Sequence, residues 1–362
     1  MAAIDPLLVH LKENDGSDLH LVAGQPPRFR AKGSVQIIEG QPELSNDTLR
    51  GMMQEVASQR AWDEYEETGD LDFAFSLEGV ARFRANYFVQ QSGAACVFRI
   101  IPEEIISLED LSLPQAICDL ADLKEGLVLV TGPTGSGKST TLAAIIDKVN
   151  KTYSRHVVTI EDPVEFVHQN RNSLFSHREV GLHTRGFGPA LKSAIRQDAD
   201  VILVGEMREM ETISLAITAA EMGMLVFGTL HTNNAAKTID RIIDAFPAEE
   251  QNMVRLSLSE SLAGIVSQLL LPRADKGGRI AANEILLKCS GLPNLIREGN
   301  TPMLSSLIQS GKNQGMQAMD DVLFAYAKEG KVTALDAYMK ATDKPRFEPL
   351  VQAEEGSVPA AG

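Results

Sequence analysis

The sequence Gly132-Pro133-Thr134-Gly135-Ser136-Gly137-Lys138-Ser139 matches the phosphate-binding pattern GxxxxGK[ST] at every specified position. It follows an apolar strand predicted over 126–131 and precedes a helical pattern over 141–150, as a P-loop requires. Glycines let backbone N–H groups turn toward a polyphosphate, and the helix N-terminus adds partial positive charge. We therefore predict a nucleoside triphosphate site in which Lys138 contacts the β and γ phosphates and Ser139 ligates Mg²⁺. The predicted binding residues are Gly132, Pro133, Thr134, Gly135, Ser136, Gly137, Lys138, Ser139 and Thr140.

Two further apolar strands end in polar residues suited to phosphate chemistry. The strand predicted over 201–204 leads into Gly205 and Glu206, like a Walker B strand with glycine where an aspartate usually precedes the glutamate. Glu206 is then the lone acid at that strand end, where hydrolysis needs a carboxylate to orient or deprotonate water. The strand predicted over 225–230 ends at His231, whose imidazole is placed to contact the γ-phosphate or to report its loss.

A third strand, predicted over 157–160, is followed by three acids within five residues: Glu161, Asp162 and Glu165. Such a cluster, taken alone, is more often a solvated turn. Its position directly after a buried strand in a P-loop domain favours a role for these acids in hydrolysis or in the magnesium shell.

The pattern of strands and helices changes near residue 101, which predicts two α/β domains. We expect an N-terminal domain over 1–101, a linker over 102–121, an ATPase domain with a helical C-terminal part over 122–344, and a flexible tail over 345–362. In the N-terminal domain, alternating or short apolar runs predict strands and a 3.6-residue period predicts one helix. The strands are expected over 18–22, 28–38 (a pair broken at Gly33), 71–77, 81–88 and 94–101, and the helix over 44–67.

Composition excludes several classes of protein. The chain has 362 residues, of which 44% are hydrophobic and 23% are charged, as is typical of globular proteins. We expect it to be cytoplasmic, because no apolar run reaches membrane-spanning length and no export signal is evident. Its three scattered cysteines do not form a disulfide framework or a metal knuckle. A net charge of −15 and a pI near 5.0 argue against nucleic acid as a partner.

Several motifs in fixed order resemble those of the secretion and type IV pilus ATPases. Within that group the chain is most similar to the PilT-type retraction ATPases, over about residues 4–340. The shared motifs are the P-loop, the acidic box 160–165, the Walker B segment 204–208, the histidine box 231–241, and the segments 16–20, 82–84, 246–250 and 315–317.

The resemblance implies an α/β fold with an N-terminal PAS-like domain and a RecA-like P-loop ATPase domain. It also implies a homohexameric motor that hydrolyses ATP with Mg²⁺. The motor is expected to act at the cytoplasmic face of the inner membrane, with which it associates peripherally through the pilus machinery. Its expected partner is a pilus platform protein, and no nucleic-acid partner is expected. In the family, Glu206 is similar to the catalytic glutamate and Glu165 to the essential acid of the box, with His231 nearby. Arginines of the N-terminal domain contact the phosphates, and Arg84 and Arg99 match them, with Arg82 a further candidate.

Three alternatives stay open. A PilU-like accessory retraction ATPase shares these motifs, and a nucleotide-gated adaptor with little hydrolysis is compatible with the missing Walker B aspartate, although Glu165 and Glu206 argue against it. An assembly ATPase is disfavoured because the four-cysteine zinc motif of assembly relatives is missing. One departure concerns the family's C-terminal signature AIRNLIRE, which reads GLPNLIRE over 291–298, with Pro293 in place of arginine.

Overall fold

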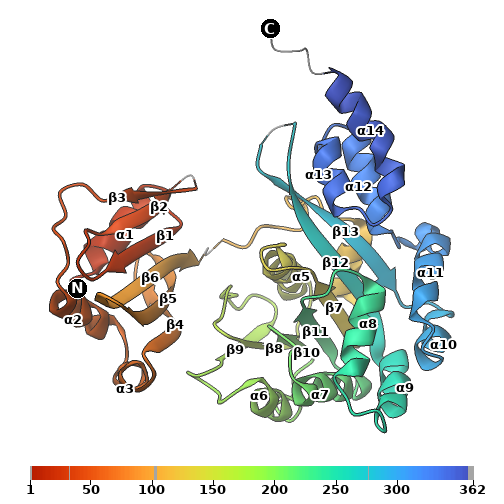
Figure 1. Ribbon diagram of the computed structural model, residues 1–362. Helices are drawn as coiled ribbons and strands as arrows, with labels where there is room; N and C mark the ends of the chain where they lie inside the picture. Colours follow the sequence, from red (N-terminus) through yellow and green to blue (C-terminus); the bar gives the residue numbers. More distant parts are fainter. Residues whose placement is uncertain (1, 32, 102–103, 276, 358–362) are drawn as a thin grey trace. The chain divides into compact units, whose positions relative to one another are not determined.

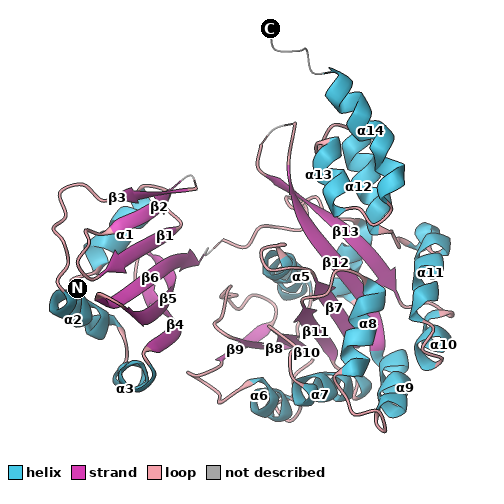
Figure 2. Cartoon of the chain, in the orientation of Figure 1, coloured by secondary structure: helices cyan, strands magenta, loops and turns pink. Residues whose placement is uncertain are grey.

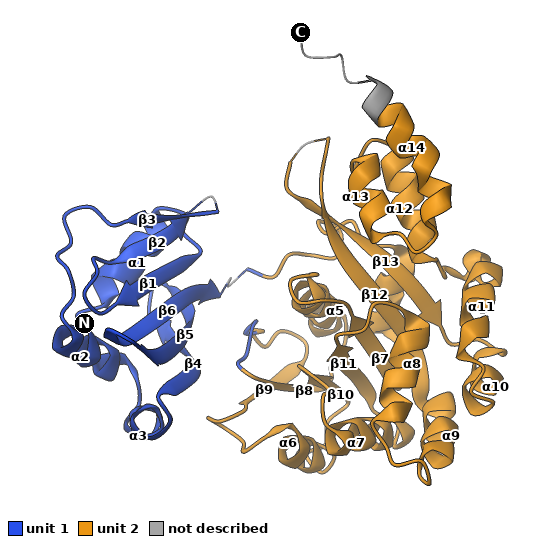
Figure 3. Ribbon diagram, in the orientation of Figure 1, with its two compact units in different colours: residues 1–104, 163–167 blue, residues 105–162, 168–362 orange. Residues whose placement is uncertain are grey.

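The computed structural model describes residues 2–31, 33–101, 104–275 and 277–357 (Figure 1). It contains two compact units, each with its own mixed arrangement of helices and sheet (Figures 2 and 3). Unit 1 comprises Met1–Glu104 and Pro163–Val167, and unit 2 comprises Ile105–Asp162 and His168–Gly362. The predicted α/β fold class is confirmed.

Unit 1 is a six-stranded antiparallel sheet in the order β3-β2-β1-β6-β5-β4. Alternation along β5 and β6 puts Phe83, Tyr87 and Phe98 on a fully buried face, packed with Leu49 and Tyr65 of the helices. The opposite face carries the polar members of the same strands. The elements are α1 (Asp5–Glu13), β1 (Asp18–Val22), β2 (Arg28–Ala31), β3 (Ser34–Ile37), α2 (Asn46–Val56), α3 (Gln59–Thr68), β4 (Asp70–Leu77), β5 (Ala81–Gln90) and β6 (Gly93–Ile101).

The single helix predicted over 44–67 is wrong, because the structure has two helices, α2 and α3, there. Ala57 is extended and ends α2. The hydroxyl of Ser58 then accepts a hydrogen bond from the backbone N–H of Ala61 at 3.3 Å and caps α3. The apolar period continues through this break because both helices bury residues against the same sheet. Ser58, as the N-cap of α3, is the local signal that marks the break.

Unit 2 is a seven-stranded sheet in the order β13-β12-β7-β11-β10-β8-β9, parallel except for β13. Its central strands bury side chains on both faces: Val128 packs with Ile145 of α5, whereas Leu127 lies in the cluster that includes Ile213 and Ile239 of α7 and α8. The elements are α4 (Gln115–Cys118), β7 (Gly126–Thr131), α5 (Lys138–Thr152), β8 (His156–Glu161), β9 (Leu174–Glu179), α6 (Phe187–Ala194), β10 (Val201–Val204), α7 (Met210–Glu221), β11 (Leu225–Leu230), α8 (Ala235–Asp244), α9 (Gln251–Ser261), β12 (Leu262–Pro272), β13 (Arg279–Leu287), α10 (Leu292–Arg297), α11 (Leu304–Ser310), α12 (Met319–Lys328), α13 (Ala334–Lys340) and α14 (Lys344–Ser357), with short 3₁₀ turns over 119–122, 301–303 and 312–314.

Strands β9 and β12 are among those of unit 2 that were not predicted. β9 is a partly exposed edge strand with the polar sequence LFSHRE, so it lacks the apolar run of its neighbours. β12 begins at Leu262 directly after α9 ends at Ser261, with no turn residues to separate helix from strand. Both strands exist because neighbouring strands supply their hydrogen bonds, which is tertiary context that a local pattern does not contain.

The ends of unit 2 differ from the expected linker and tail. Ile117 and Leu120, within the expected linker 102–121, are buried in the core of unit 2; residues 102 and 103 lie outside the described part. Most of the expected flexible tail 345–362 forms helix α14 instead, while 358–362 lie outside the described residues. Phe347 of α14 is fully buried, which explains the order of this helix.

Charged contacts support the same helix. The carboxylate of Asp321 on α12 accepts hydrogen bonds from Lys312 at 2.6 Å and from Arg346 of α14 at 2.7 Å. Burial raises the pKa of Asp321, but the bonds from Lys312, Arg346 and Gln309 outweigh it and lower that pKa to about 2. None of the helices in the described part of the chain is both long and apolar enough to span a bilayer.

We predict that Phe347→Ala releases α14 from its bundle, because truncating a buried phenylalanine costs about 3 kcal/mol or more. Amide hydrogen exchange should speed up across Lys344–Ser357 and the thermal unfolding temperature should fall. Met339→Ala is the matched control, since Met339 in the neighbouring α13 is 64% exposed. Equal exchange in the Phe347→Ala variant and the parent would contradict the packing argument.

Candidate nucleotide-binding site

The turn between β7 and α5 forms a phosphate cradle that only glycine permits. Gly132, Gly135 and Gly137 have φ values of 144°, 78° and 86°, in the region that residues with a Cβ rarely enter. At Gly132 an added Cβ would lie 2.2 Å from the carbonyl oxygen of Gln268. The three glycines of the motif are therefore required by backbone conformation, and at Gly132 also by contact with a neighbouring strand.

Gln268 of β12 holds the cradle from the side. Its Nε2 donates to the Ser136 carbonyl at 2.6 Å, and its Oε1 accepts from the Thr141 hydroxyl at 2.9 Å. Gln268 is 2% exposed, so both of its amide atoms need such partners. Sequence reasoning missed this residue, although a glutamine inside the otherwise apolar stretch 262–272 was a usable signal.

The polar groups of the cradle fit a polyphosphate. Lys138 is 9% exposed, and its ammonium donates to the carbonyls of Gly132 at 2.9 Å and Pro133 at 3.2 Å. The buried hydroxyl of Ser136 has no hydrogen-bond partner among the described residues. Ser139 and Thr140 lie half-buried in the first turn of α5, where N–H groups and the helix dipole favour anions. The donor set also fits Mg²⁺ beside the phosphates, since Ser139 supplies a hydroxyl ligand.

The carboxyl ends of four parallel strands meet at one edge of the unit 2 sheet. Across that edge the order is β7, β11, β10 and β8, so the P-loop is followed by His231, Glu206 and Glu161. Nε2 of His231 lies 2.9 Å from Oε1 of Glu206, and Nε of Arg208 donates to the same oxygen. The structure thus brings two residues predicted from separate strands, Glu206 and His231, into contact. Arg208, which has no role assigned from the sequence, is a third member of this group.

Packing explains why glycine replaces the usual Walker B aspartate. The backbone N–H of Gly205 donates to the Ile160 carbonyl at 2.8 Å, which holds the end of β10 against β8. A Cβ on Gly205 would lie 3.2 Å from that oxygen and 3.3 Å from Cα of Glu161, tighter than ordinary contact. The position beside Gly205 is occupied by Glu161, an 8% exposed carboxylate at the end of the adjacent strand. Of the three acids predicted after this strand, Glu161 is therefore the one that lies beside Gly205 at the strand end, whereas the family resemblance points to Glu165.

The structure divides the acidic box. Glu161 is the last residue of β8, whereas Asp162 and Glu165 belong to the loop that follows. Glu165 is exposed, and its segment Pro163–Val167 groups with unit 1. The three acids therefore do not form one cluster of equivalent groups.

In unit 1, the structure brings Arg84 and Arg99 together. They are direct cross-strand partners in the antiparallel pair of β5 and β6. Nε of Arg84 donates to both carboxylate oxygens of Asp72, at 3.0 and 3.1 Å, and Nε of Arg99 donates to Oδ1 of Asp18 at 2.7 Å. Arg82 lies two residues from Arg84 and opposes Ile101. Two guanidinium groups on the polar face of one sheet are suited to an oxyanion.

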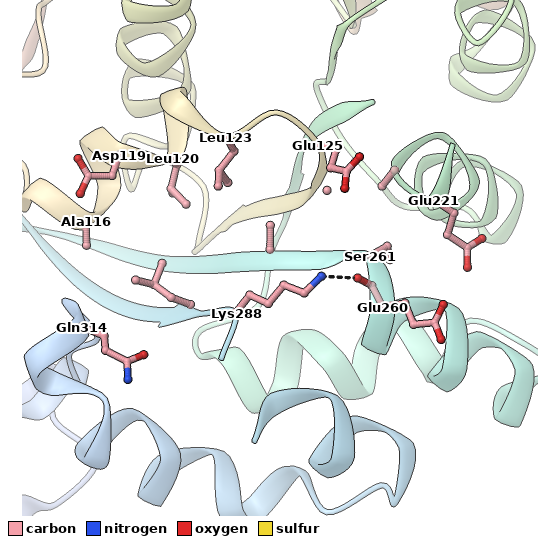
Figure 4. Close-up of a pocket in the computed structure, with 14 residues that line it drawn as sticks. Ala116, Asp119, Leu120, Leu123, Glu125, Glu221, Glu260, Ser261, Lys288 and Gln314 are labelled. Carbon is pink, nitrogen blue, oxygen red and sulfur yellow. Dashed lines mark hydrogen bonds between the residues drawn. The ribbon is translucent and has the colours of Figure 1, made fainter. Parts of the chain in front are cut away.

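A cavity of about 560 Å³ lies at the other edge of the unit 2 sheet, at the amino ends of the strands (Figure 4). Its lining includes Gly126 at the start of β7, Ser261 before β12, and Lys288, whose Nζ donates to the Glu260 carbonyl at 2.6 Å. It shares no residue with the P-loop or the strand-end acids. In open parallel sheets ligands bind at the carboxyl ends of strands, so the nucleotide site is the glycine cradle.

Comparisons with known proteins identify one family and several similar relatives. The family described as "Type II/IV secretion system protein" matches residues 2–315. The chain is 48% identical over 338 residues to "Type IV pilus retractation ATPase PilT" of Pseudomonas aeruginosa, covering 93% of this chain and 98% of the relative. It is 49% identical over 315 residues to "Twitching motility protein" of Neisseria gonorrhoeae, covering 87% and 84%. "Type IV pilus ATPase PilU" of Pseudomonas aeruginosa is 40% identical, covering 93% and 88%.

A solved structure supports the fold over the whole chain. "Crystal Structure of the Pilus Retraction Motor PilT and Bound ADP" aligns with a TM-score of 0.89 at 42% identity, covering 96% of this chain and 99% of that one. The relative holds ADP, a product of the kind of reaction that the glycine cradle predicts.

We predict that restoring the common aspartate, Gly205→Asp, destabilises the protein. A side chain there must displace Ile160 or Glu161, and overpacking of this kind costs about 1–3 kcal/mol. The new carboxylate also lies beside that of Glu161. Thermal unfolding should give a lower midpoint for Gly205→Asp than for Gly205→Ala, which adds only the Cβ. An aspartate variant as stable as the parent would show that the glycine has no packing cause.

Proposed function

The chain belongs to the type II/IV secretion system protein family and within it to the type IV pilus retraction ATPases, and from that premise we propose how its residues work. It is an ATP-hydrolysing motor for pilus retraction. The contact between Glu206 and His231 at the strand ends supports our assignment of roles. His231 follows the strand next to the P-loop strand, and Glu206 follows the strand after that.

The cradle 132–140 binds the triphosphate of ATP. Backbone N–H groups of the glycine turn surround the phosphates, the Ser136 hydroxyl gains a partner, and Lys138 exchanges its carbonyl contacts for the β and γ phosphates. Such an exchange strengthens the bond of the ammonium, because a phosphate oxygen carries more charge than a carbonyl. Ser139 holds Mg²⁺, which supplies further neutralisation of phosphate charge.

Glu206 acts on the attacking water. A water molecule attacks the γ-phosphorus while the bond to the β–γ bridging oxygen breaks, and the carboxylate of Glu206 accepts a proton from that water. His231 and Arg208 fix the Oε1 atom of Glu206 and leave Oε2 for this role. Since His231 follows the strand between Glu206 and the P-loop, it is also suited to sense the loss of the γ-phosphate.

The remaining predicted residues come from unit 1 and from the acidic-box loop. We assign Arg84 and Arg99 to neutralising charge that gathers on the γ-phosphate, because a guanidinium matches phosphate geometry in a bidentate way. Glu165 completes the acidic set. In this scheme ATP binding and hydrolysis drive the mechanical stroke of the motor.

The motor requires an assembly. We propose that six copies form a ring at the cytoplasmic face of the inner membrane, where the ring turns a platform protein of the pilus and removes pilus subunits. Its association with the membrane is peripheral, through the pilus machinery, and nucleic acid has no role. The sequence relationship to the PilT and twitching-motility proteins, with coverage of most of each chain, supports this setting.

The C-terminal signature also fits this function. Pro293 stands in the first turn of α10 (Leu292–Arg297), where proline is compatible with a helix, so its substitution for arginine does not disrupt the segment. Leu292 and Ile296 are buried within unit 2. We therefore propose that α10 couples ATP hydrolysis to pilus retraction, with Asn294, Arg297 and Glu298 exposed for contact.

The two nearest alternatives are less well supported. The accessory ATPase PilU is 40% identical, against 48% for PilT of the same organism, so the retraction motor is the better match. A nucleotide-gated adaptor was plausible because Walker B lacks its aspartate. The packing of Gly205 against Glu161 supplies a structural reason for that change, with Glu206 kept at the strand end.

We predict that Glu206→Gln lowers steady-state phosphate release at least a hundredfold and leaves ATP binding within a few fold, because only the proton acceptor is removed. Phosphate release and binding of a fluorescent ATP analogue measure the two effects. Glu209→Gln is the control, since Glu209 is an exposed glutamate three residues away. A parent protein that binds ATP but does not turn over would favour the adaptor.

In cells, we predict that deleting the gene leaves excess, immobile surface pili and abolishes twitching. Pili that are still assembled but no longer removed should accumulate, whereas loss of an assembly motor would give cells without pili. Electron microscopy and a surface motility assay distinguish the two. Complementation with Glu206→Gln should fail and complementation with Glu209→Gln should succeed.

A further inference from the structure

The polar face of the unit 1 sheet carries a straight row of four charged residues. Cross-strand register pairs Arg30 of β2 with Asp18 of β1, Asp18 with Arg99 of β6, and Arg99 with Arg84 of β5. Neighbouring strands are about 4.8 Å apart, so the row places the guanidinium groups of Arg30 and Arg99 on either side of the Asp18 carboxylate, with Arg84 one strand further. Asp18 belongs to the segment 16–20, a motif of the chain to which the mechanism above gives no role.

Asp18 is built into the sheet with both of its oxygens engaged. It is 5% exposed; Oδ1 accepts from Nε of Arg99 at 2.7 Å, and Oδ2 accepts from the hydroxyl of Ser17 at 2.7 Å. Arg30 approaches Oδ2 to 4.0 Å. A carboxylate held on both sides has a fixed direction, and at this burial its field is little screened by solvent.

Arg99 is oriented by this contact. Its side chain is 67% exposed, and the bond to Asp18 uses Nε, so the Nη1 and Nη2 end of the guanidinium points away from the carboxylate. That end supplies donors for a second oxyanion. Arg84 directly opposes Arg99 on the neighbouring strand, so one oxyanion can accept hydrogen bonds from both guanidinium groups.

We propose that Asp18 is a positioning residue for ATP hydrolysis, which aims the Nη donors of Arg99 at the phosphates. The proposal rests on the proposed function, in which Arg99 contacts nucleotide. Asp72 has the corresponding place at Arg84, but it is more exposed, with 37% of its side chain accessible against 7% for Asp18. Asp72 binds both Nε and Nη2 of Arg84, whereas Asp18 binds only Nε of Arg99, so Arg99 keeps both terminal nitrogens for an oxyanion.

Gly16, another residue of the segment 16–20, is explained by packing. A Cβ on Gly16 would lie 2.5 Å from Cδ1 of Leu11 and 2.9 Å from the ring of Phe29, so the glycine serves packing. Nothing of this kind requires an acid at position 18. A buried carboxylate is costly unless it is paired, and its pairing with an exposed arginine is a poor way to gain stability.

The test is the isosteric variant Asp18→Asn, assayed as full-length protein for ATP turnover. We expect kcat to fall about tenfold or more with KM changed less than threefold, because the misdirected Arg99 is needed chiefly in the transition state. Asp70→Asn is the control: Asp70 is an exposed acid of β4, and its loss changes the net charge equally. Unchanged kcat in Asp18→Asn would overturn the proposal.

A double-mutant cycle separates positioning from folding. If Asp18 acts through Arg99, then Asp18→Asn adds no further loss to Arg99→Ala, whereas independent structural damage would multiply the two losses and lower the unfolding temperature. A normal kcat in Arg99→Ala refutes the proposed role of Arg99 itself. A loss in Arg99→Ala together with multiplied losses in the double variant refutes only the role of Asp18.

Discussion

The nucleotide site depends on the hydrogen bonds and close packing between strand β12 and the P-loop. Gln268 bonds the loop carbonyl of Ser136 and the Thr141 hydroxyl of α5, while its own carbonyl closes off the space where Gly132 would carry a side chain. These contacts hold the P-loop, the first turn of α5 and strand β12 together. A phosphate then meets N–H donors already in place, and little ordering cost is left for the moment of binding. This arrangement requires β12 to pair with β7, so the site depends on the sheet order as much as on its motif.

The motif itself was predictable because its physics is local. Glycine freedom, a lysine and a hydroxyl within eight residues, and a flanking strand and helix are all visible in the sequence. The strand-end acids were predictable as members of one edge, since parallel strands end together. Their order was not, because the position of His231 between the P-loop and Glu206 follows from strand pairing across long separations. Gln268 escaped notice for the same reason.

The errors have a common origin in tertiary packing. The break between α2 and α3 was hidden by an apolar period that serves one sheet through both helices, although Ser58 marked it. The C-terminal segment reads as a tail by composition, yet the burial of Phe347 orders α14. Arg84 and Arg99 were named from the family resemblance alone, and their position opposite each other follows from the hairpin register of β5 and β6.

Electrostatic interactions explain how the charged side chains of the site are arranged. A chain with a net charge of −15 repels ATP at long range, so binding depends on the cationic groups and N–H donors at the site itself. The acids near these groups are held by hydrogen bonds with defined geometry: Asp18 and Asp72 take the Nε side of their arginines, and Glu206 is held at one oxygen by His231 and Arg208. Asp18 binds Arg99 through Nε alone and leaves both terminal nitrogens as donors, whereas Asp72 also accepts from Nη2 of Arg84. The acidic residues therefore orient the cationic ones, and a protein that is acidic as a whole keeps a site with affinity for a polyanion.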